Sequence, residues 1–578
     1  MKDSTSHSLN SSFILKRILR NDVGRVRTLF QRFFQFFFFP IRLFYFLFLL
    51  LRSTRLRKKN RIHWEFPTEF ETSEKSFFVR KFQGKPSNPN RIEFLHLFQI
   101  LYHQNHIQEI KISLPPIRWT LADVWEVREE IVRLKVEKQI RFFGFAKEGG
   151  LASLLLLSAC DEVYLNENAE FQLSLPSAEP SFYGDFLKTW GIEIEAFASG
   201  PFKSFAESFT RNSFSKEAKQ NISQLIEELQ SKILKALQEK ISNHESIFYQ
   251  PFLSASSLLA CGFANGIAKE EDFFSEEKPF TDESALPRWK AASDFRFFPK
   301  RRAFLSIVPL EGGITAGDFQ EENRELGKIS AYPSIKLLQS LREDANVKAV
   351  ILEIDSPGGS AFHSELLYQE IKQLREKKPV FAYFRNTAAS GGYYIASATE
   401  AIYASPICIT GSIGAVSIRA NIKKLYNKFK IKKEPIGFYP FREIHSEYTP
   451  LTTKSKQLLH EEIRRVELQF YNRVKEGRGF TDADLKSLGG GRVYLPKKEN
   501  KVVDELGGIF QLIQTIKTKL GTERMFISYE LPIYHIRSEI PLLGRFFRNQ
   551  RHLQESFQFL ESHLLNRVLY YLPIRIQY

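Results

Sequence analysis

Cysteine is scarce in this chain of 578 residues, and no histidine group has the spacing of a known metal site. The three cysteines, Cys160, Cys261 and Cys408, are far apart and odd in number, which argues against a disulfide framework or a cysteine metal cluster. The histidines are scattered, and none has the His-Glu-x-x-His spacing of a zinc hydrolase. We therefore expect the cysteines to be small buried apolar side chains, and we expect no metal or other cofactor.

The sequence also lacks a generally basic surface and a flexible linker. Its net charge is +16, but residues 1–61 hold 14 Lys or Arg against 2 Asp or Glu, which leaves +4 for the other 517 residues. A nearly neutral body does not favour nucleic acid as a partner. The length exceeds that of one compact core, and no Gly/Ser-rich segment divides the chain, so we expect two rigidly joined domains.

A hydrophobic run at residues 33–51 lies within the basic N-terminal segment. Its 19 residues are just enough to cross a bilayer as a helix. Pro40 and Arg42 interrupt the run, so an interfacial helix with a snorkelling Arg42 is the alternative to a membrane span. No small-residue cleavage site follows, which disfavours a cleaved signal peptide. Six basic residues on each side, at 16–32 and 52–61, leave the orientation unassigned by charge.

Two parts of the chain match each other at a fixed offset of 239 residues. Repetition at one spacing indicates a tandem duplication. In both copies, apolar runs of strand length alternate with helical patterns, which predicts an α/β fold of βαβ units around parallel strands. The matched pairs include Ser158/Ser397, Ala159/Ala398, Tyr164/Tyr403, Pro201/Pro440 and Phe202/Phe441.

The apolar periodicity also predicts individual elements. In copy two we expect strands at 347–354 and 380–384 and helices at 364–377 and 390–398, and in copy one a strand at 110–112. Two long amphipathic helices, at about 216–243 and 454–476, are expected to pack between domains or subunits.

The two copies have lost different residues at matched positions. Copy two carries Ser390 where copy one has Leu151, and copy one carries Lys203 where copy two has Arg442. A serine hydroxyl is a weak nucleophile until a base removes its proton, and an arginine keeps its own proton and cannot be that base. We therefore expect one composite active site, with Ser390 as nucleophile and Lys203 as general base.

Lys203 must be neutral near pH 7 to act as a base. A free lysine has a pKa of about 10.4, so burial has to lower this pKa by several units. Phe202 and Phe205 flank Lys203 and are expected to exclude water. Ser412, in Thr-Gly-Ser-Ile-Gly at 410–414, is a candidate to orient the lysine amine, and its alternative role is a turn hydroxyl.

Glycines around Ser390 suggest an oxyanion hole. Ser390 is expected to begin a helix, where free N–H groups and the helix dipole favour negative charge. Gly391 can present an unobstructed N–H, and Gly359 of the glycine turn is expected to supply a second donor. The alternative is that these glycines only permit close helix–strand packing. Copy one has Pro115 and Pro116 in place of this turn.

Four segments of copy two resemble the signal peptide peptidase A family in its long, duplicated bacterial form. They are Asp-Ser-Pro-Gly-Gly at 355–359, Ala-Ala-Ser-Gly-Gly-Tyr-Tyr at 388–394, Thr-Gly-Ser-Ile-Gly-Ala at 410–415 and Val-Val-Asp-Glu-Leu-Gly-Gly at 502–508. The resemblance covers about residues 62–520 and is weaker in copy one. It implies two tandem domains of the Clp-protease/crotonase-like fold behind a membrane-anchor helix.

The resemblance also implies a membrane-anchored serine peptidase with a Ser/Lys dyad. Ser390 would be its nucleophile, Lys203 its base, Ser412 the orienting hydroxyl, and Gly359 with Gly391 its oxyanion hole. The implied substrates are cleaved signal peptides and other unfolded apolar peptides. The implied partners are membrane lipid, through the anchor, and further copies of the chain in a tetrameric ring on the periplasmic side of the bacterial inner membrane. Residues 200–204 depart from the commoner Gly-Lys-Tyr-Lys-Ser pattern by reading Gly-Pro-Phe-Lys-Ser.

The expected organisation has four parts. Residues 1–61 form the basic segment with the anchor at 33–51, 62–300 a degenerate peptidase-like domain with the lysine, 301–522 the catalytic domain with the serine, and 523–578 a docking or membrane-surface tail.

Three other functions fit the sequence less well. A crotonase-like acyl-CoA enzyme would use a catalytic carboxylate and would not need a serine at the helix start. An inactive membrane scaffold would not need to retain both Ser390 and Lys203. A Ser-His-Asp hydrolase based on His363 or His445 lacks an identifiable partner carboxylate.

Overall fold

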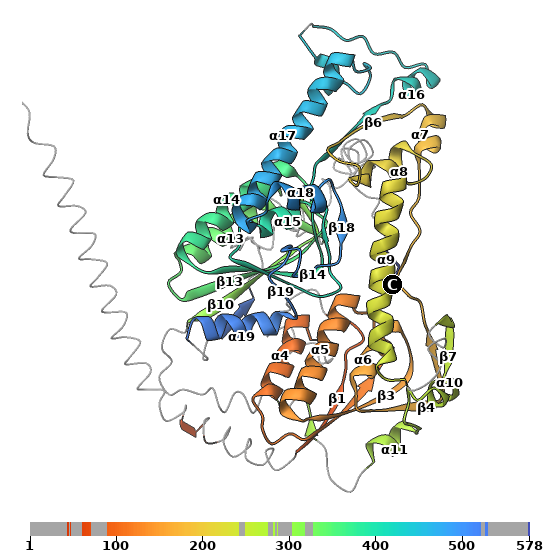
Figure 1. The fold of residues 1–578 in the computed structure, drawn as a ribbon, viewed down its shortest axis with the longest axis vertical. Helices are drawn as coiled ribbons and strands as arrows, with labels where there is room; N and C mark the ends of the chain where they lie inside the picture. The colour runs from red at the N-terminus through yellow and green to blue at the C-terminus, as the bar shows by residue number, and fades with distance from the viewer. Residues whose placement is uncertain are drawn as a thin grey trace, which may run out of the picture.

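The computed structural model describes residues 60–70, 89–241, 249–275, 281–283, 286, 303–317, 327–437 and 439–521, with residues 43, 44 and 47 and the backbone of 526–529 and 576–577 (Figure 1). Among these residues, no helix combines the length and the apolar character needed to cross a bilayer. The hydrophobic run at 33–51 lies outside the described residues except at 43, 44 and 47. The membrane anchor therefore stays a prediction, as does the role of most of the tail.

The first half forms a mostly parallel sheet with the strand order β7-β4-β3-β2-β1-β9, and β8 pairs with β4. Only the β4–β7 pair is antiparallel among these strands. The strands are β1 (Arg61–Glu65), β2 (Glu109–Leu114), β3 (Arg141–Gly150), β4 (Glu162–Gln172), β7 (Phe252–Ser254), β8 (Gly266–Ile267) and β9 (Thr281–Asp282). The helices around it are α4 (Arg91–Tyr102), α5 (Leu121–Lys138), α6 (Leu151–Ala159), α10 (Ala255–Ala260) and α11 (Glu270–Phe274).

The second half forms another mostly parallel sheet, in the order β18-β16-β14-β13-β10-β20, with β15 beside β14 and β19. Its antiparallel pair is β16–β18. The strands are β10 (Phe304–Glu311), β13 (Val347–Ser356), β14 (Val380–Ala389), β15 (Ala401–Ala404), β16 (Ile409–Gly411), β18 (Val493–Tyr494), β19 (Glu505–Leu506) and β20 (Phe526–Tyr529). The helices are α13 (Ala331–Glu343), α14 (Ala361–Lys377), α15 (Gly391–Ala396), α17 (Thr453–Arg478), α18 (Asp482–Leu488) and α19 (Ile509–Lys519).

Corresponding elements of the two sheets keep the offset seen in the sequence. β3 and β14 begin at Arg141 and Val380, and β4 and β15 begin at Glu162 and Ala401, so both pairs start 239 residues apart. The predicted α/β class is confirmed. The predicted strands and helices are also found, although the helix expected to run to Ala398 ends at Ala396. The domain boundaries and the Clp-protease/crotonase-like assignment remain predictions.

The two sheets share a continuous apolar core. Side chains alternate along a strand, so β13 directs Val350, Leu352 and Ile354 to one face and Ala349 and Ile351 to the other. The first face packs with the helices α13, α14 and α15, while the second joins the cluster that contains the core of the first half. Figure 1 shows α4, α5 and α19 in the layer between the sheets. This shared core agrees with the expected rigid joint.

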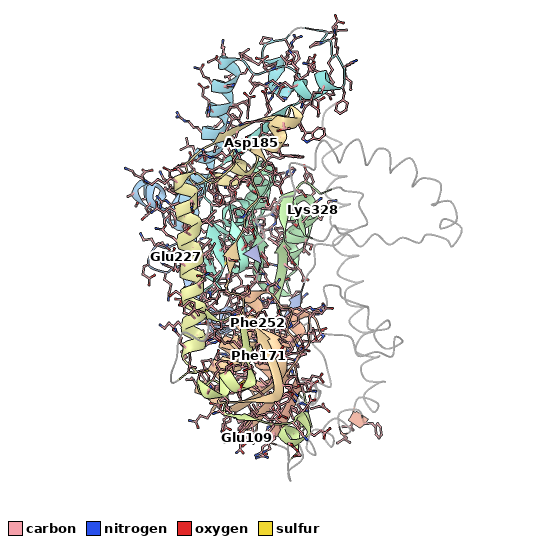
Figure 2. All side chains as sticks on the ribbon, turned by 90° about the vertical axis from the view of Figure 1, so that its right-hand side faces the viewer. Glu109, Phe171, Asp185, Glu227, Phe252 and Lys328 are labelled. Carbon is pink, nitrogen blue, oxygen red and sulfur yellow. The ribbon has the colours of Figure 1, made fainter. Side chains whose placement is uncertain are left out.

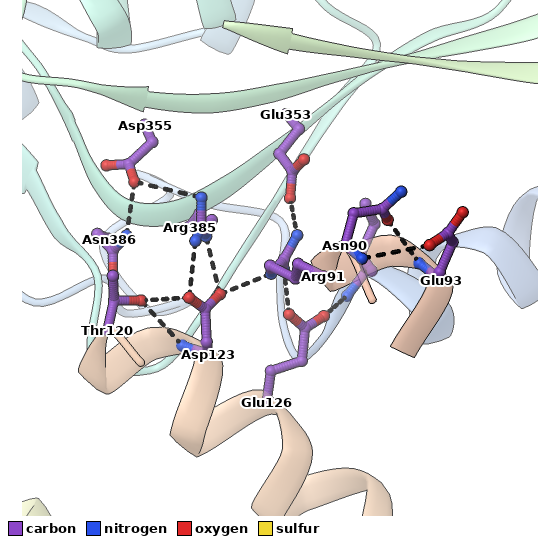
Figure 3. A network of polar contacts seen from close by, with 11 residues as sticks. Asn90, Arg91, Glu93, Thr120, Asp123, Glu126, Glu353, Asp355, Arg385 and Asn386 are labelled. Atoms are coloured by element: carbon purple, nitrogen blue, oxygen red, sulfur yellow. Dashed lines mark hydrogen bonds and ion pairs between the residues drawn. The ribbon is translucent and has the colours of Figure 1, made fainter. Parts of the chain in front are cut away.

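A buried charged network lies in the same layer (Figure 3). Arg91 of α4 forms ion pairs with Glu126 of α5 and, across the interface, with Glu353 of β13. Arg385 of β14 donates two hydrogen bonds, of 2.8 and 2.7 Å, to Asp123 of α5. Buried ions are tolerated only when they are paired, so this network fixes the register between the halves.

Helix α9 (Lys216–Gln238) runs alongside both halves (Figure 1). Near its start, the Asn221 amide donates to the Val493 carbonyl at 2.8 Å and accepts from the Val493 N–H at 3.0 Å. Leu229 and Ile233, farther along, are buried in the core of the first half. The predicted packing of this helix between domains is thereby confirmed.

Candidate active site

One strand from each half forms a two-stranded antiparallel ribbon beside the second sheet. The strands are β6 (Glu193–Ala198) and β17 (Val416–Asn421). At the base of this ribbon, the Ser199 N–H donates to the Ala415 carbonyl at 2.9 Å, and the Ala415 N–H donates to the Ser199 hydroxyl at 2.8 Å. Lys203 follows the first strand by a few residues, and Ser412 precedes the second, so this pairing brings both residues to one place.

Ser390 occupies a strained turn between β14 and α15. Its φ of 52° and ψ of −119° lie outside the regions that L-residues normally adopt, as at other nucleophiles held between a strand and a helix. Its side chain does not cap the helix that it begins. The Ser390 N–H instead donates to the Gly411 carbonyl at 2.9 Å, which fixes the turn. The hydroxyl is thus free to bond elsewhere.

Lys203 reaches this hydroxyl from the other half of the chain. Its Nζ lies 3.0 Å from the Oγ of Ser390, 2.9 Å from the Oγ of Ser412 and 2.7 Å from the carbonyl oxygen of Ser412. A neutral amine has two N–H donors and one lone pair. If both donors bind Ser412, the lone pair faces the Ser390 hydroxyl, which is the geometry of a general base.

Burial changes the protonation of Lys203. The side chain is 8% exposed, and loss of hydration lowers its pKa to about 7, although the Glu467 carboxylate acts in the opposite direction. At a pKa of about 7, roughly half of the amines are neutral at pH 7. The several-unit decrease expected from the sequence is therefore present.

Residues of the other half pack closely against the Lys203 segment. Of the two aromatic neighbours expected to exclude water, Phe205 is 47% exposed. The glycine run at 489–491 contacts the segment: a Cβ on Gly491 would lie 2.8 Å or less from the Lys203 backbone and Cβ. Arg492 then stacks on the Phe202 ring at 3.8 Å. This glycine run could have been singled out from the sequence, since 489–491 is the one run of three glycines in the chain.

Glu467 and Tyr471 of α17 help to hold the segment that carries Lys203, and the sequence did not point to either residue. The Tyr471 hydroxyl donates to Glu467 at 3.0 Å and accepts from the Gly490 N–H at 3.1 Å. The Gly490 carbonyl accepts in turn from the Phe202 N–H at 3.1 Å. This chain of hydrogen bonds connects α17 to the segment that carries Lys203.

The glycine turn approaches Ser390 closely. A Cβ on Gly358, which has φ +104°, would lie 2.6 Å from the Ser390 Cβ and 2.7 Å from the Gly391 nitrogen. Ile314 donates to the Gly358 carbonyl at 2.8 Å and accepts from the Ser360 N–H at 2.9 Å. Because N–H groups alternate along an extended segment, the Gly359 N–H faces away from Ile314. Gly391 holds the first position of α15, where an N–H has no partner within the helix.

The other candidate groups lie apart from Ser390. The His363 Nδ1 lies 2.9 Å from the Ser360 hydroxyl, and its ring contacts Tyr332. Arg442 donates to the Gly437 carbonyl at 2.8 Å. His445 ends a short 3₁₀ helix at Arg442–His445. The structure thus pairs Ser390 with Lys203, which also contacts Ser412, and in the described part of the chain Ser390 bonds to neither histidine.

The expected state of the cysteines is confirmed. Cys160, Cys261 and Cys408 are free and buried. Burial raises the pKa of the Cys160 thiol to about 12, so this cysteine is a poor nucleophile.

The fold is α/β, and the candidate site brings a serine hydroxyl within 3.0 Å of a buried lysine amine. The family model for peptidase family S49 matches residues 149–244 and 372–523. The chain belongs to peptidase family S49, as the sequence motifs predicted. A putative protease of Synechocystis sp. is 33% identical over 185 residues, which make up 31% of this chain and 67% of that protein.

Two longer relatives match more of the chain. The chloroplastic serine protease SPPA of Arabidopsis thaliana is 28% identical over 432 residues, covering 72% of this chain and 63% of its own length. Protease 4 of Haemophilus influenzae is 27% identical over 382 residues, covering 62% of this chain and 61% of its own length. The chain therefore spans somewhat less than two thirds of these two relatives.

Proposed function

We propose that the chain is a serine endopeptidase that uses a Ser390/Lys203 dyad. The observation that carries the proposal is the 3.0 Å contact between the Lys203 Nζ and the Ser390 Oγ, made by a buried lysine whose pKa is about 7. Membership of family S49 and the printed names of the relatives support peptide hydrolysis as the reaction.

The proposed reaction proceeds in two stages. The Ser390 Oγ attacks the carbonyl carbon of the scissile peptide bond while its proton passes to the Lys203 lone pair. The Ser412 hydroxyl and carbonyl hold the resulting ammonium. This ammonium then protonates the leaving amine nitrogen, the C–N bond breaks, and an acyl ester remains on Ser390. Water attacks the ester, Lys203 accepts a water proton, and the ammonium returns a proton to Ser390 as the acid leaves.

Negative charge develops on the carbonyl oxygen in both stages. We assign its stabilisation to the N–H groups of Gly359 and Gly391. The support is that the Gly359 N–H faces away from Ile314, while Gly391 begins a helix directly after the nucleophile. The absence of a side chain at Gly358 lets the two segments approach each other.

The proposed substrates are unfolded apolar peptides, including signal peptides left after secretion. This part rests on the family resemblance of the sequence motifs. It includes anchoring through the run at 33–51, tandem Clp-protease/crotonase-like domains, assembly into a homo-oligomer, and a location on the periplasmic side of a bacterial inner membrane.

A serine-reactive peptidyl phosphonate tests the proposal on the purified full chain. We expect mass spectrometry to find the phosphonyl group on Ser390, at no more than one group per chain. Ser390→Ala should abolish both labelling and peptide hydrolysis while the thermal unfolding temperature stays near that of the wild type. Hydrolysis by the Ser390→Ala protein would disprove the proposal. A wild-type protein that neither reacts nor cleaves peptides would favour the inactive scaffold instead.

A further inference from the structure

The Asp-Ser-Pro-Gly-Gly segment at 355–359 begins with a carboxylate that the proposed reaction does not use. Asp355 lies near the end of β13, next to the glycine turn that approaches Ser390. Its side chain is only 17% exposed, and a carboxylate withdrawn from water to this extent is costly unless it is hydrogen-bonded. The groups that bond to it therefore indicate what it holds in place.

The ladder between β13 and β14 is interrupted at Asp355. Ile354 lies opposite Phe384 and Ser356 lies opposite Ala388, so β14 advances by four residues while β13 advances by two. A bulge of this kind leaves residues of the longer strand without their ladder partners. The residues of β14 inside the bulge are Arg385, Asn386 and Thr387.

The Asp355 carboxylate contacts every residue inside the bulge. The Thr387 N–H donates to one carboxylate oxygen at 3.1 Å. The Asn386 amide donates to the other oxygen at 2.5 Å, and Arg385, which also holds Asp123 of the first half, forms an ion pair with it at 3.9 Å (Figure 3). The carboxylate thus takes the place of a ladder carbonyl for the Thr387 N–H, three residues before the nucleophile.

Asp355 is also bonded to the segment that leads into the glycine turn. The Gly312 N–H donates to the Asp355 carbonyl at 2.8 Å. The Ser356 hydroxyl donates to the Gly312 carbonyl at 2.6 Å and accepts from the Gly358 N–H at 3.2 Å. Gly358 is the residue whose added Cβ would lie 2.6 Å from the Ser390 Cβ. Asp355 therefore stands between the glycine turn on one side and the strand that carries the nucleophile on the other.

The half without a nucleophile lacks this arrangement. The first residue of β14 pairs with Val350, and the first residue of β3 pairs with Glu109, which Figure 2 labels near the lower end of the molecule. Counted from these two pairs, Asp355 corresponds to Leu114. Leu114 lies opposite Ala146, and the ladder between β2 and β3 has no register shift. The bulge and the carboxylate thus occur together, in the half that carries the serine.

We propose that Asp355 is a positioning residue for the oxyanion hole. By joining β13 to β14 at the bulge, it sets the separation between the N–H groups of Gly359 and Gly391. This inference rests on the proposed peptidase reaction, in which those two N–H groups stabilise the negative charge. Because Asp355 acts through Thr387 and the turn, its loss should weaken binding of the transition state more than binding of the substrate.

Two variants of Asp355 and one matched control test this proposal in the full chain. Asp355→Ala removes both carboxylate oxygens, whereas Asp355→Asn keeps one oxygen that can accept from the Thr387 N–H. Asp504→Ala is the control, because Asp504 also accepts a strand N–H, from Ile402 at 2.7 Å, and pairs with Arg478 at 2.8 Å. Ile402 lies beside the start of β14, at the end of that strand away from the nucleophile.

We expect Asp355→Ala to lower kcat by about 10²-fold and Asp355→Asn to lower it less, with KM changed by less than about two-fold. A peptide aldehyde, whose adduct with Ser390 carries an oxyanion, should bind more weakly in proportion to the loss of kcat. The acidic limb of the kcat/KM profile should stay near pH 7, because the Lys203 contacts are kept. The phosphonate should label the same final fraction of chains as in the wild type, but more slowly. Asp504→Ala should leave kcat and aldehyde affinity within about two-fold of the wild type.

Unchanged kcat in Asp355→Ala, or equal losses in the Asp355 and Asp504 variants, would overturn the proposal. A shifted acidic limb would show that Asp355 acts on Lys203 instead, and a smaller labelled fraction would show that it only maintains the fold.

Hydrogen exchange separates this proposal from the peptidase proposal, since it needs no activity. Asp355→Ala should speed amide exchange in peptides that cover 356–360 and 386–391, and Asp504→Ala should not. This result in a protein that hydrolyses no peptide would refute the peptidase reaction while leaving Asp355 as the residue that holds the two segments. Unchanged exchange in a protein that does hydrolyse peptides would refute the role of Asp355 alone.

Discussion

The Nζ of Lys203 lies 3.0 Å from the Oγ of Ser390, although 187 residues separate the two in the chain. Each side chain comes from a different half, and neither half contains both. The position of Lys203 depends on the β6–β17 ribbon and on the glycine run of the opposite half. Activity should therefore respond to substitutions far in sequence from the nucleophile.

The first prediction concerns pH. Lys203 must be neutral to accept the Ser390 proton, and burial lowers its pKa to about 7. We expect kcat/KM to rise with pH through an apparent pKa near 7 and then to level off. Lys203→Arg should reduce kcat by about 10²–10⁴-fold, as Lys203→Ala does, because an arginine stays protonated. Substantial activity in the arginine variant would show that the site needs only a positive charge.

The second prediction isolates Glu467. Its carboxylate raises the pKa of Lys203 against the larger effect of burial. Glu467→Gln should therefore lower that pKa and move the acidic limb of the kcat/KM profile to lower pH, by roughly 0.5–1 pH unit. Glu462→Gln is the control, because Glu462 lies on the same helix but pairs with Arg465 on the surface. A profile that moves equally in both variants, or in neither, would contradict an electrostatic role for Glu467.

The members of the candidate site could be chosen from the sequence, but not their surroundings. Ser390 and Lys203 were chosen because the two copies differ at matched positions, and Ser412 from its Thr-Gly-Ser-Ile-Gly segment; the structure brings the three together. Phe202 and Phe205, neighbours in sequence, were expected to exclude water from Lys203, but Phe205 is 47% exposed, and residues 489–491 of the other half pack against the Lys203 backbone. Local sequence does not reveal contacts of that range.

The fold, too, could be predicted only in part. The periodicity of apolar residues predicted the positions of strands and helices, and the alternation of strands and helices in both copies predicted a parallel sheet in each half. The charged layer between the sheets was not foreseen, because Arg91 and Glu353 each look like an ordinary surface charge in the sequence. They become partners because side chains alternate along β13, which places Glu353 on the face of the strand toward Arg91 of α4.

The third prediction tests the glycine run. Gly491 has φ +88°, and a Cβ there would lie within 2.8 Å of Lys203. Gly491→Ala should displace the lysine and reduce kcat by at least about 10²-fold, since misplacement of a catalytic group by about 1 Å has that cost. Gly479→Ala is the matched control: its φ is +65°, but nothing lies within 4 Å of the added Cβ. Both variants should lose about 1 kcal/mol of stability from backbone strain. If Gly491→Ala and Gly479→Ala are equally active, the expected clash between residue 491 and Lys203 does not occur.

The fourth prediction concerns the layer between the halves. Burial raises the pKa of Asp123, but Arg385 and Arg91 outweigh burial and bring it to about 2. A lowered folded-state pKa stabilises the protein above the unfolded value near 3.8, and this contribution is lost as the pH falls through about 2. Arg385→Met should lower the free energy of unfolding at pH 7 by about 3–5 kcal/mol, because it removes a bidentate partner from a buried carboxylate.

Denaturant titration measures this difference. Arg465→Met, which breaks an exposed ion pair with Glu462, should change the free energy of unfolding by less than about 0.5 kcal/mol. Similar losses in Arg385→Met and Arg465→Met would mean that the buried pair adds nothing beyond a surface charge.

The last prediction asks whether the lysine can be supplied by the other half. Arg442 is the counterpart of Lys203 in copy two, yet its guanidinium donates to the Gly437 carbonyl at 2.8 Å, whereas the Lys203 amine contacts Ser390. Arg442→Lys in a Lys203→Ala background should therefore stay inactive, because the new amine has no route to Ser390. Small primary amines added to Lys203→Ala should restore part of the activity, since they can occupy the space beside Ser412 and accept the Ser390 proton. This rescue is the positive control that the variant site is intact. Activity regained by the double variant without added amine would mean that the two halves exchange roles, and the assignment of the base to copy one alone would then be wrong.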